Sequence, residues 1–449
     1  MKELRQADPT LHKILPAQKL RPGARYRRSV FAVPYPDLNE DRGGEGKRDG
    51  DRLLWFNTLT RQLVEPVCRL PDAGEVVTAE EAEADPELLE LVRNFFLVPE
   101  DADETARYIK LYQIMHALIR TKDEKGFTIL PTTACNAHCV YCYEEGWRQQ
   151  TMTREMALRV VDHIEKETPS GKITLLWFGG EPLAAVPVID LICRELRAKE
   201  IAFSGEMITN GSLITEEVAD KMSGRWNIRS VQVSMDGDER DYIARKQYVT
   251  PGDQYRGVFR AVRLLTDRGI RVHIRCNVDE DNIGGIESFL QDLSKAVPDR
   301  ALVDVSLSAL NQLRASDRAP IIWKKIVAAG PLLEKYGVSG KDHRFTLHDL
   351  RNYFCMAEMG TELILPDGSI YACELFSEES RLGNILEGPA DREARKNFCR
   401  TDRVRDKCRD CPFLPECTPF ASCPRVEARC REVYRICFEE QVRRFLQDH

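Results

Sequence analysis

The sequence has no run of about 18 apolar residues, the length that a membrane-spanning helix needs, so no segment is expected to cross a membrane. Its first residues, 1–13, are charged and lack the apolar centre of a secretory signal, which argues against a secreted, disulfide-stapled protein. The formal net charge of −7 leaves no dense basic face and argues against a general nucleic-acid binder. We therefore expect a soluble protein of the cytoplasm.

Cysteine is the one unusual component, because the 449 residues contain fifteen. The composition is otherwise that of a globular protein, with 43% hydrophobic and 31% charged residues, and the length predicts two or three domains. The cysteines gather in two places, often only two or three residues apart. This spacing favours metal ligation over disulfide bonds, which need a specific separation of two backbones.

The chain divides into three predicted regions, 1–122, 123–345 and 346–449. The first has no clustered cysteine and combines short strands with small helices, which predicts a small α+β module; its polar, glycine-rich stretch 39–51 is expected to be a mobile loop. The last holds nine of the cysteines and few apolar runs. We expect metal, rather than a core, to hold this last region together.

The middle region alternates strand-like and helix-like segments six times, which predicts an α/β fold with a parallel sheet. Six strands are too few for a closed eight-stranded barrel, so we predict a partial (β/α)6 TIM-like barrel with its chemistry at the carboxyl ends of the strands. The strand-like segments are 127–131, 173–178, 206–209, 231–234, 272–277 and 302–307.

Directly after the first of these strands the sequence reads T-A-C-N-A-H-C-V-Y-C-Y, with thiols at Cys135, Cys139 and Cys142. Three thiolates at this spacing can hold three irons of a cubane and leave the fourth iron open. Open coordination positions are where catalytic metal sites bind exogenous ligands. A zinc loop with a distant fourth ligand, such as His138, is the alternative that the cysteine spacing alone leaves open.

These three cysteines together with Tyr141 form a C-x3-C-x-Y-C motif that resembles the signature of radical S-adenosylmethionine enzymes. The second strand ends in W-F-G-G-E-P, in which Gly179, Gly180 and Glu181 resemble the GGEP motif of the same superfamily. The resemblance implies a [4Fe–4S] cluster at the three cysteines and S-adenosylmethionine on its open iron, with the amine held at Gly180 and Glu181. Glycines there would let the backbone come close to the ligand.

The ends of later strands supply further candidate contacts to S-adenosylmethionine. By resemblance, Asn210 and Ser234 are candidates for the ribose or the methionyl group and Arg275 for the carboxylate, while Tyr141 is expected to shield the cluster and the adenine. A turn or capping role is the equal alternative for Asn210. The family's chemistry implies a 5′-deoxyadenosyl radical that abstracts a hydrogen atom from the substrate.

The tail resembles the SPASM domain, which carries two auxiliary iron–sulfur clusters in peptide- and protein-modifying radical enzymes. Its cysteines read C-x12-G-x4-C, then C-x2-C-x5-C-x5-C and a last cysteine, with five residues before Cys423 where the family has three. A zinc ribbon is the alternative for the C-x2-C pair. By position, the resemblance assigns Cys408, Cys411, Cys417 and Cys437 to a distal cluster and Cys355, Cys373 and Cys423 to a proximal one, which gives three [4Fe–4S] clusters in the chain.

The proximal set has three cysteines where a cubane needs four ligands. Two candidates could complete it: Cys430, the unassigned thiol nearest in sequence to Cys423, or a cysteine of the substrate. Cys399 is the other unassigned thiol of the tail.

Among enzymes with this domain, the sequence most resembles maturases of ribosomally made peptides, and an added N-terminal module fits a grip on a leader peptide by strand addition. We expect a precursor peptide as substrate, crosslinked through a thioether or carbon–carbon bond, and a small redox protein as electron donor. An anaerobic sulfatase-type maturase is the enzyme alternative. Such maturases place an aspartate directly after the G-x4-C cysteine, where this chain has Glu374, the candidate catalytic residue. An electron-transfer protein is the non-enzyme alternative, but an electron carrier needs no open iron.

Overall fold

The computed structural model describes residues 1–8, 11–35, 53–119, 125–168, 172–339, 347–351, 355–401, 404–417, 423 and 429–448. Within these residues no helix is long and apolar enough to cross a membrane. The stretch 39–51, which we predicted as a mobile loop, lies outside the described residues.

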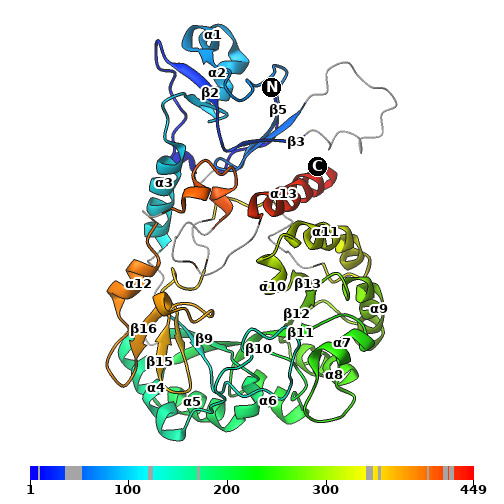
Figure 1. Cartoon of the computed structure of the whole chain (residues 1–449). Coiled ribbons are helices and arrows are strands. Elements are labelled where there is room, and N and C mark those ends of the chain that lie inside the picture. Colours follow the sequence, from blue (N-terminus) through cyan, green and yellow to red (C-terminus); the bar gives the residue numbers. More distant parts are fainter. Residues whose placement is uncertain are drawn as a thin grey trace.

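In the N-terminal region, the described residues between 1 and 119 form two small antiparallel sheets and three α-helices (Figure 1). The first sheet has the order β1 (Lys2–Arg5), β5 (Leu63–Glu65), β4 (Leu54–Asn57), β3 (Ala32–Tyr35), and the second has the order β6 (Val77–Thr78), β2 (Arg25–Arg28), β7 (Leu97–Pro99). The helices are α1 (Ala79–Ala84), α2 (Pro86–Arg93) and α3 (Glu104–Ile119). Thr78 and Glu81 form a capping box that starts α1, and Asp85 caps α2 just before Pro86.

The largest sheet of the described residues has nine strands, in the order β13-β12-β11-β10-β9-β8-β14-β15-β16. Its strands β8 to β13 run parallel and neighbour one another in chain order, which confirms the predicted, mostly parallel α/β arrangement. Figure 1 shows these strands in an arc with helices along its outer side. The strands are β8 (Lys125–Ile129), β9 (Lys172–Trp177), β10 (Ala202–Thr209), β11 (Ile228–Met235), β12 (Arg271–Val278) and β13 (Val303–Ala309).

Helices connect these parallel strands, as the sequence pattern predicted. They are α4 (Arg154–Glu167), α5 (Val186–Ala198), α6 (Glu216–Ser223), α7 (Glu239–Lys246), α8 (Gln254–Thr266) and α9 (Ile286–Ala296), with α10 (Asn311–Arg314) and α11 (Ala319–Lys335) after the last strand. Side chains alternate between the two faces of a strand. On β12, Val272, Ile274 and Cys276 pack into the core under the helices, so Arg275 and Asn277 face the opposite side of the sheet.

The cysteine-rich tail extends the central sheet instead of forming a metal-held unit by itself. Strand β14 (Glu362–Ile364) pairs in parallel with β8, and β15 (Ser369–Tyr371) and β16 (Arg381–Asn384) follow it as antiparallel strands. After α12 (Arg392–Phe398), the chain ends in α13 (Cys430–Asp448). The prediction that metal replaces a core here is therefore incomplete, because tail residues such as Phe413 and Phe438 are buried.

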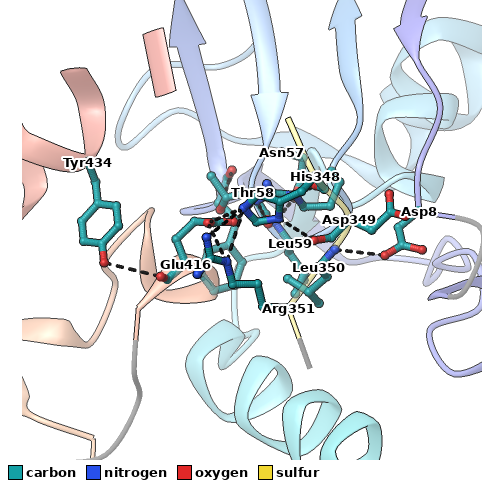
Figure 2. Close-up of polar contacts among 12 residues, drawn as sticks. Asp8, Asn57, Thr58, Leu59, His348, Asp349, Leu350, Arg351, Glu416 and Tyr434 are labelled. Atoms are coloured by element: carbon teal, nitrogen blue, oxygen red, sulfur yellow. Dashed lines mark hydrogen bonds and ion pairs between the residues drawn. The ribbon is translucent and has the colours of Figure 1, made fainter. Parts of the chain in front are cut away.

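The N-terminal region and the tail share one hydrophobic core. Phe56 of β4 packs against Phe438 of α13 with ring centroids 5.7 Å apart, and Phe438 packs in turn against Phe413. Polar contacts cross the same junction, where Figure 2 shows Glu416 near His348, Arg351 and Tyr434. The Leu350 amide donates to Asp8 at 3.0 Å, and the Arg61 side chain donates to the His348 carbonyl at 2.8 Å.

Candidate functional site

The cysteine loop, residues 132–143, leaves the carboxyl end of β8 and carries Cys135, Cys139 and Cys142. The three partly exposed thiols lie close enough to influence one another's pKa, and the Cys142 amide donates to the Cys139 carbonyl at 3.0 Å. Burial raises the pKa of Cys135 to about 11. Its thiolate therefore needs a neighbouring positive charge such as a metal.

The donor chemistry of the loop fits an iron–sulfur cluster. Within the described part of the chain, no group of three or more His, Cys, Asp or Glu side chains is arranged to hold a single metal ion. A cubane is compatible with this, because it takes one thiolate per iron and its cysteines need not converge on one point.

A second segment, residues 245–249, braces the cysteine loop. The Val140 amide donates to the Arg245 carbonyl, the His138 amide to the Gln247 carbonyl, and the Val249 amide to the Asn136 carbonyl, each at 3.0 Å. Gln247 ends α7 in the left-handed conformation, with a φ of 47°, and this turns the chain back along the loop. Backbone bonds therefore fix the loop that carries the three thiols.

Gly179 and Gly180 allow the end of β9 to lie against the cysteine loop. A Cβ atom on Gly179 would stand 2.4 Å from the Thr132 carbonyl oxygen, and one on Gly180 would stand 2.4 Å from that of Ala134. Gly179 also has a φ of +123°, which disfavours any other residue. The sequence predicted close approach to a ligand at these glycines, and the structure shows close approach to the segment that precedes Cys135.

Glu181 is fully buried and joins the ends of two strands. Its carboxylate accepts hydrogen bonds from the Leu183 amide at 3.1 Å, the Thr209 hydroxyl at 2.7 Å and the Asn210 amide at 2.8 Å. Burial raises the pKa of Glu181, and these donors oppose the rise. The predicted contact of this carboxylate with a ligand amine stays a prediction, since three of its acceptor positions serve the fold.

Asn210 holds a turn next to the loop. Its side-chain oxygen accepts from the Ser212 amide at 3.0 Å, and its amide group donates to Asn136 of the cysteine loop at 2.8 Å. This is the turn role that the sequence left open as an alternative, and it also ties the end of β10 to the thiol-bearing segment.

Tyr141 and Ser234 meet a buried ion pair between Asp236 and Lys246. The Tyr141 hydroxyl donates to the Asp236 carboxylate, 2.6 Å and 2.7 Å from its two oxygens, and accepts from the Lys246 ammonium at 3.0 Å. The same ammonium donates to the Ser234 hydroxyl at 2.9 Å and lies 3.6 Å from Asp236. The Asn277 side chain also donates to the Tyr141 hydroxyl, at 3.4 Å. Two residues predicted to contact the cofactor are thus held by one lysine.

Arg275 and Glu374 both influence the pKa of Tyr143, at the end of the cysteine loop. Glu374 also acts on the neighbouring Glu144, whose pKa is raised to about 7, chiefly by burial. The Phe376 ring packs edge-on against Trp147 with centroids 4.6 Å apart. The tail segment that carries Glu374 therefore lies beside the cysteine loop, and the catalytic role of Glu374 stays a prediction.

The tail cysteines form two groups. Cys355 and Cys423 both influence the pKa of Cys373, so the three predicted proximal ligands lie together. The predicted distal ligands Cys408, Cys411 and Cys417 are each influenced by Cys430. The resemblance to the SPASM domain instead assigns Cys437 as the fourth ligand of the distal cluster. That residue is seven positions further along α13, about 10.5 Å at 1.5 Å per residue, and packs in the core with Val433.

A cavity of about 290 Å³ opens beside Tyr141. Val140 and Tyr141 of the cysteine loop, Arg245 of the brace and Leu310 after β13 line it. Arg245 lies over the Tyr141 ring at 5.4 Å and bonds to Asp279 at 2.7 Å. The cavity combines an aromatic wall with charged groups, as small-molecule sites do.

The sequence did not identify Lys246 or the brace, and it considered Cys430 only as a fourth ligand of the proximal cluster. A lysine at the end of a polar helix usually indicates a solvated surface. The available signal was the register of the helix, because Lys246 lies four positions after Tyr242, which is buried.

Comparison with known proteins agrees with this geometry. Residues 129–293 match the model of the Radical SAM superfamily. An uncharacterized protein of Methanocaldococcus jannaschii is 24% identical over 287 residues, which are 63% of this chain and 93% of that protein. Fe-coproporphyrin III synthase of Methanosarcina barkeri is 25% identical over 191 residues, 40% of this chain and 44% of that enzyme. Among solved structures, anSMEcpe with bound AdoMet and Cp18Cys peptide has a TM-score of 0.56 at 19% identity, covering 72% of this chain and 99% of that one. This likeness shows the fold.

Proposed function

Because residues 129–293 form a domain of the Radical SAM superfamily, we propose that this protein is a peptide maturase that uses S-adenosylmethionine and iron–sulfur clusters. The observation that carries the proposal is the cysteine loop, which is fixed on one side by the glycines after β9 and on the other by the 245–249 brace. A loop held at both sides keeps three thiols in register for one cluster.

Cys135, Cys139 and Cys142 would hold the first [4Fe–4S] cluster, which supplies the electron for reductive cleavage of S-adenosylmethionine when both are bound. Tyr141 and the 290 Å³ cavity beside it offer an aromatic surface for the adenine. Ser234, oriented by Lys246, and Arg275, on the open face of the sheet, would contact the ribose and the carboxylate. Since the Glu181 carboxylate is enclosed, the backbone at Gly180 and Glu181 would meet the amine.

The tail would hold two auxiliary clusters, which makes three in the chain. We place the distal one at Cys408, Cys411, Cys417 and Cys430, because Cys430 influences the pKa of each of the other three. The proximal one at Cys355, Cys373 and Cys423 then keeps three protein ligands, and a substrate cysteine would be the fourth. Coordination by the proximal cluster would deprotonate such a thiol and hold it in place for thioether formation.

A precursor peptide is the proposed substrate, and a small redox protein is the proposed electron donor. Strand β1 lies at the edge of the first N-terminal sheet and exposes Lys2 and Glu3, so a peptide strand could add there. The N-terminal region (1–122), the open (β/α)6 barrel (123–345) and the tail (346–449) are the proposed working units. A cytoplasmic location is proposed with them.

Oxidation of a serine or cysteine, as in sulfatase maturation, is the second candidate. The observation in its favour is Glu374, which lies near Tyr143 and Glu144 and could accept the proton released in such an oxidation. Serine oxidation and crosslinking each remove two hydrogen atoms, so the product mass alone does not separate them. A hydrazine probe distinguishes the two maturases, because it labels the aldehyde of formylglycine and does not label a crosslink.

Anaerobic reconstitution tests the proposal. The full chain, loaded with iron and sulfide and mixed with S-adenosylmethionine and dithionite, should form 5′-deoxyadenosine, which chromatography with mass detection measures. A reconstituted protein that forms none would contradict the enzyme and leave an electron-transfer protein as the remaining alternative.

A further inference from the structure

Lys246 is enclosed in the middle of the proposed cluster site, with only 2% of its side chain exposed. A lysine ammonium is strongly hydrated, and proteins bury it only where partners replace the water. Here the ammonium donates hydrogen bonds to the Tyr141 and Ser234 hydroxyls and forms an ion pair with Asp236 at 3.6 Å. The chain therefore holds a fixed positive charge at this point.

The position of this charge relative to the cysteine loop is specific. Tyr141 lies between Cys139 and Cys142 in sequence, and Lys246 is hydrogen-bonded to its hydroxyl. Lys246 also belongs to the brace whose backbone pairs with the loop. The Lys246 ammonium also lies 5.6 Å from the centroid of the Tyr141 ring. Asp236, fully buried, carries the opposite charge on the same side of the loop.

We propose that Lys246 is a positioning and charge-tuning residue of the three-cysteine cluster, which fixes Tyr141 and Ser234 and makes the cluster easier to reduce. This rests on the proposed function. Reduction adds one electron to a cluster, so a nearby cation favours the reduced form and a nearby anion opposes it. Lys246 and Asp236 therefore act on the reduction potential with opposite signs.

Because Lys246 and Asp236 carry opposite charges, variants of the two residues can separate an effect on the reduction potential from a general disturbance of the site. Lys246→Met removes the cation and should make the cluster harder to reduce, while Asp236→Asn removes the anion and should make it easier to reduce. Lys246→Arg keeps the charge and should stay near the wild type. Lys199→Met is the matched control, because it removes one lysine charge from an exposed cluster with Glu165 and Asp162 on the outer helices.

The measurement is a potentiometric titration of the reconstituted full chain, followed by electron paramagnetic resonance. The three-cysteine cluster is identified as the signal that changes when S-adenosylmethionine is added. Opposite shifts for Lys246→Met and Asp236→Asn, with no shift for Lys199→Met, support the proposal. Shifts of the same sign, or no shift in either variant, overturn it. If Lys246→Met binds no iron at the loop, the other two variants test the proposal. It is then supported by a raised reduction potential in Asp236→Asn together with an unchanged potential in Lys246→Arg, and any other result overturns it.

Failure of the proposed function gives a different result. In that case no signal of the wild-type protein responds to S-adenosylmethionine. A responsive wild-type signal with no opposite shifts rejects only the role of Lys246.

Discussion

The guanidinium of Arg61 and the carboxylate of Glu416 form an ion pair that is buried on both sides, with 0% and 4% of the side chains exposed. Arg61 lies in the turn between β4 and β5, and Glu416 directly precedes Cys417 in the tail. Arg61 also donates to the His348 carbonyl at 2.8 Å, and its guanidinium lies 5.1 Å from the Phe56 ring. These contacts of Arg61 therefore join the N-terminal region to the part of the tail that carries the proposed distal cluster. Deleting residues 1–120 would remove this ion pair and the N-terminal side of the hydrophobic core that the tail shares with the N-terminal region.

Arg61→Met should lower the free energy of unfolding by about 3–5 kcal/mol, because it leaves the Glu416 carboxylate buried without its main partner. The double variant Arg61→Met/Glu416→Gln should lose less than the sum of the two single variants. Urea unfolding measures both. Arg21→Met is the control, since Arg21 and Asp101 are an exposed pair and should contribute little. Equal losses of unfolding free energy in Arg61→Met and Arg21→Met would contradict a stabilising role of the buried Arg61–Glu416 pair.

Replacing any one of Cys135, Cys139 or Cys142 with alanine should abolish formation of 5′-deoxyadenosine. The reason is that a cubane held by two thiolates is not kept in register at its open iron. Bound iron should fall by about four per chain while the tail clusters persist. Iron analysis and product detection check this, and normal rates in all three variants would exclude the cluster from the loop.

Gly180→Ala should displace the cysteine loop without unfolding the protein. The added methyl group would stand 2.4 Å from the Ala134 carbonyl and 2.6 Å from the Thr133 carbonyl, and both are backbone atoms that can move only with the loop. We expect loss of iron from the loop and retention of the circular dichroism spectrum. Gly284→Ala is the matched control, since a Cβ there meets no heavy atom within 4 Å. Full iron loading in Gly180→Ala would show that the loop tolerates the shift.

Cys430→Ala should remove the distal cluster, and Cys437→Ala should leave it in place. Cys430 acts on Cys408, Cys411 and Cys417, whereas Cys437 packs in a hydrophobic core two turns further along the same helix. Both variants replace a cysteine of α13 with alanine, so they differ only in the position of the lost thiol. Iron content and electron paramagnetic resonance measure whether the distal cluster is present in each. The reverse result, with loss of the cluster only in Cys437→Ala, would restore the assignment made from sequence order.

The sequence predicted the parallel strands and most of their helices because hydrophobic periodicity is strong where a strand is covered by helices. It missed strands β14, β15 and β16, since segments of three or four residues carry too little periodicity. Motif spacing identified the cysteine loop, whose members are neighbours along the chain. It assigned Cys437 to the distal cluster and considered Cys430 only for the proximal one, because spacing along the chain does not show which part of α13 lies near Cys408. Lys246 was missed because burial of a charged side chain depends on partners that are distant in sequence.

Glu362 begins β14 and connects the tail hairpin to the barrel at the end of the sheet opposite the cysteine loop. Its carboxylate lies 2.6 Å from the His163 ring nitrogen and 2.5 Å from the Lys125 ammonium, with 3% of the side chain exposed. Burial raises the pKa of Glu362, but these two partners outweigh it and hold the pKa below the ordinary value of 4.5. Residues at this end of a barrel serve stability rather than chemistry.

Because the folded-state pKa is lowered, the ionised carboxylate stabilises the protein above pH 4.5, and that stabilisation is lost as the pH falls through the folded-state value. Glu362→Gln should therefore lower the unfolding free energy at pH 7 by roughly 1.5–3 kcal/mol, the range for hydrogen bonds to charged groups. The difference from wild type should shrink below pH 4.5, where Glu362 becomes protonated when the chain unfolds. Glu287→Gln, which breaks an exposed pair with Lys335, is the control and should change stability little at either pH. A constant difference across the whole pH range would mean that Glu362 acts through packing instead of its charge.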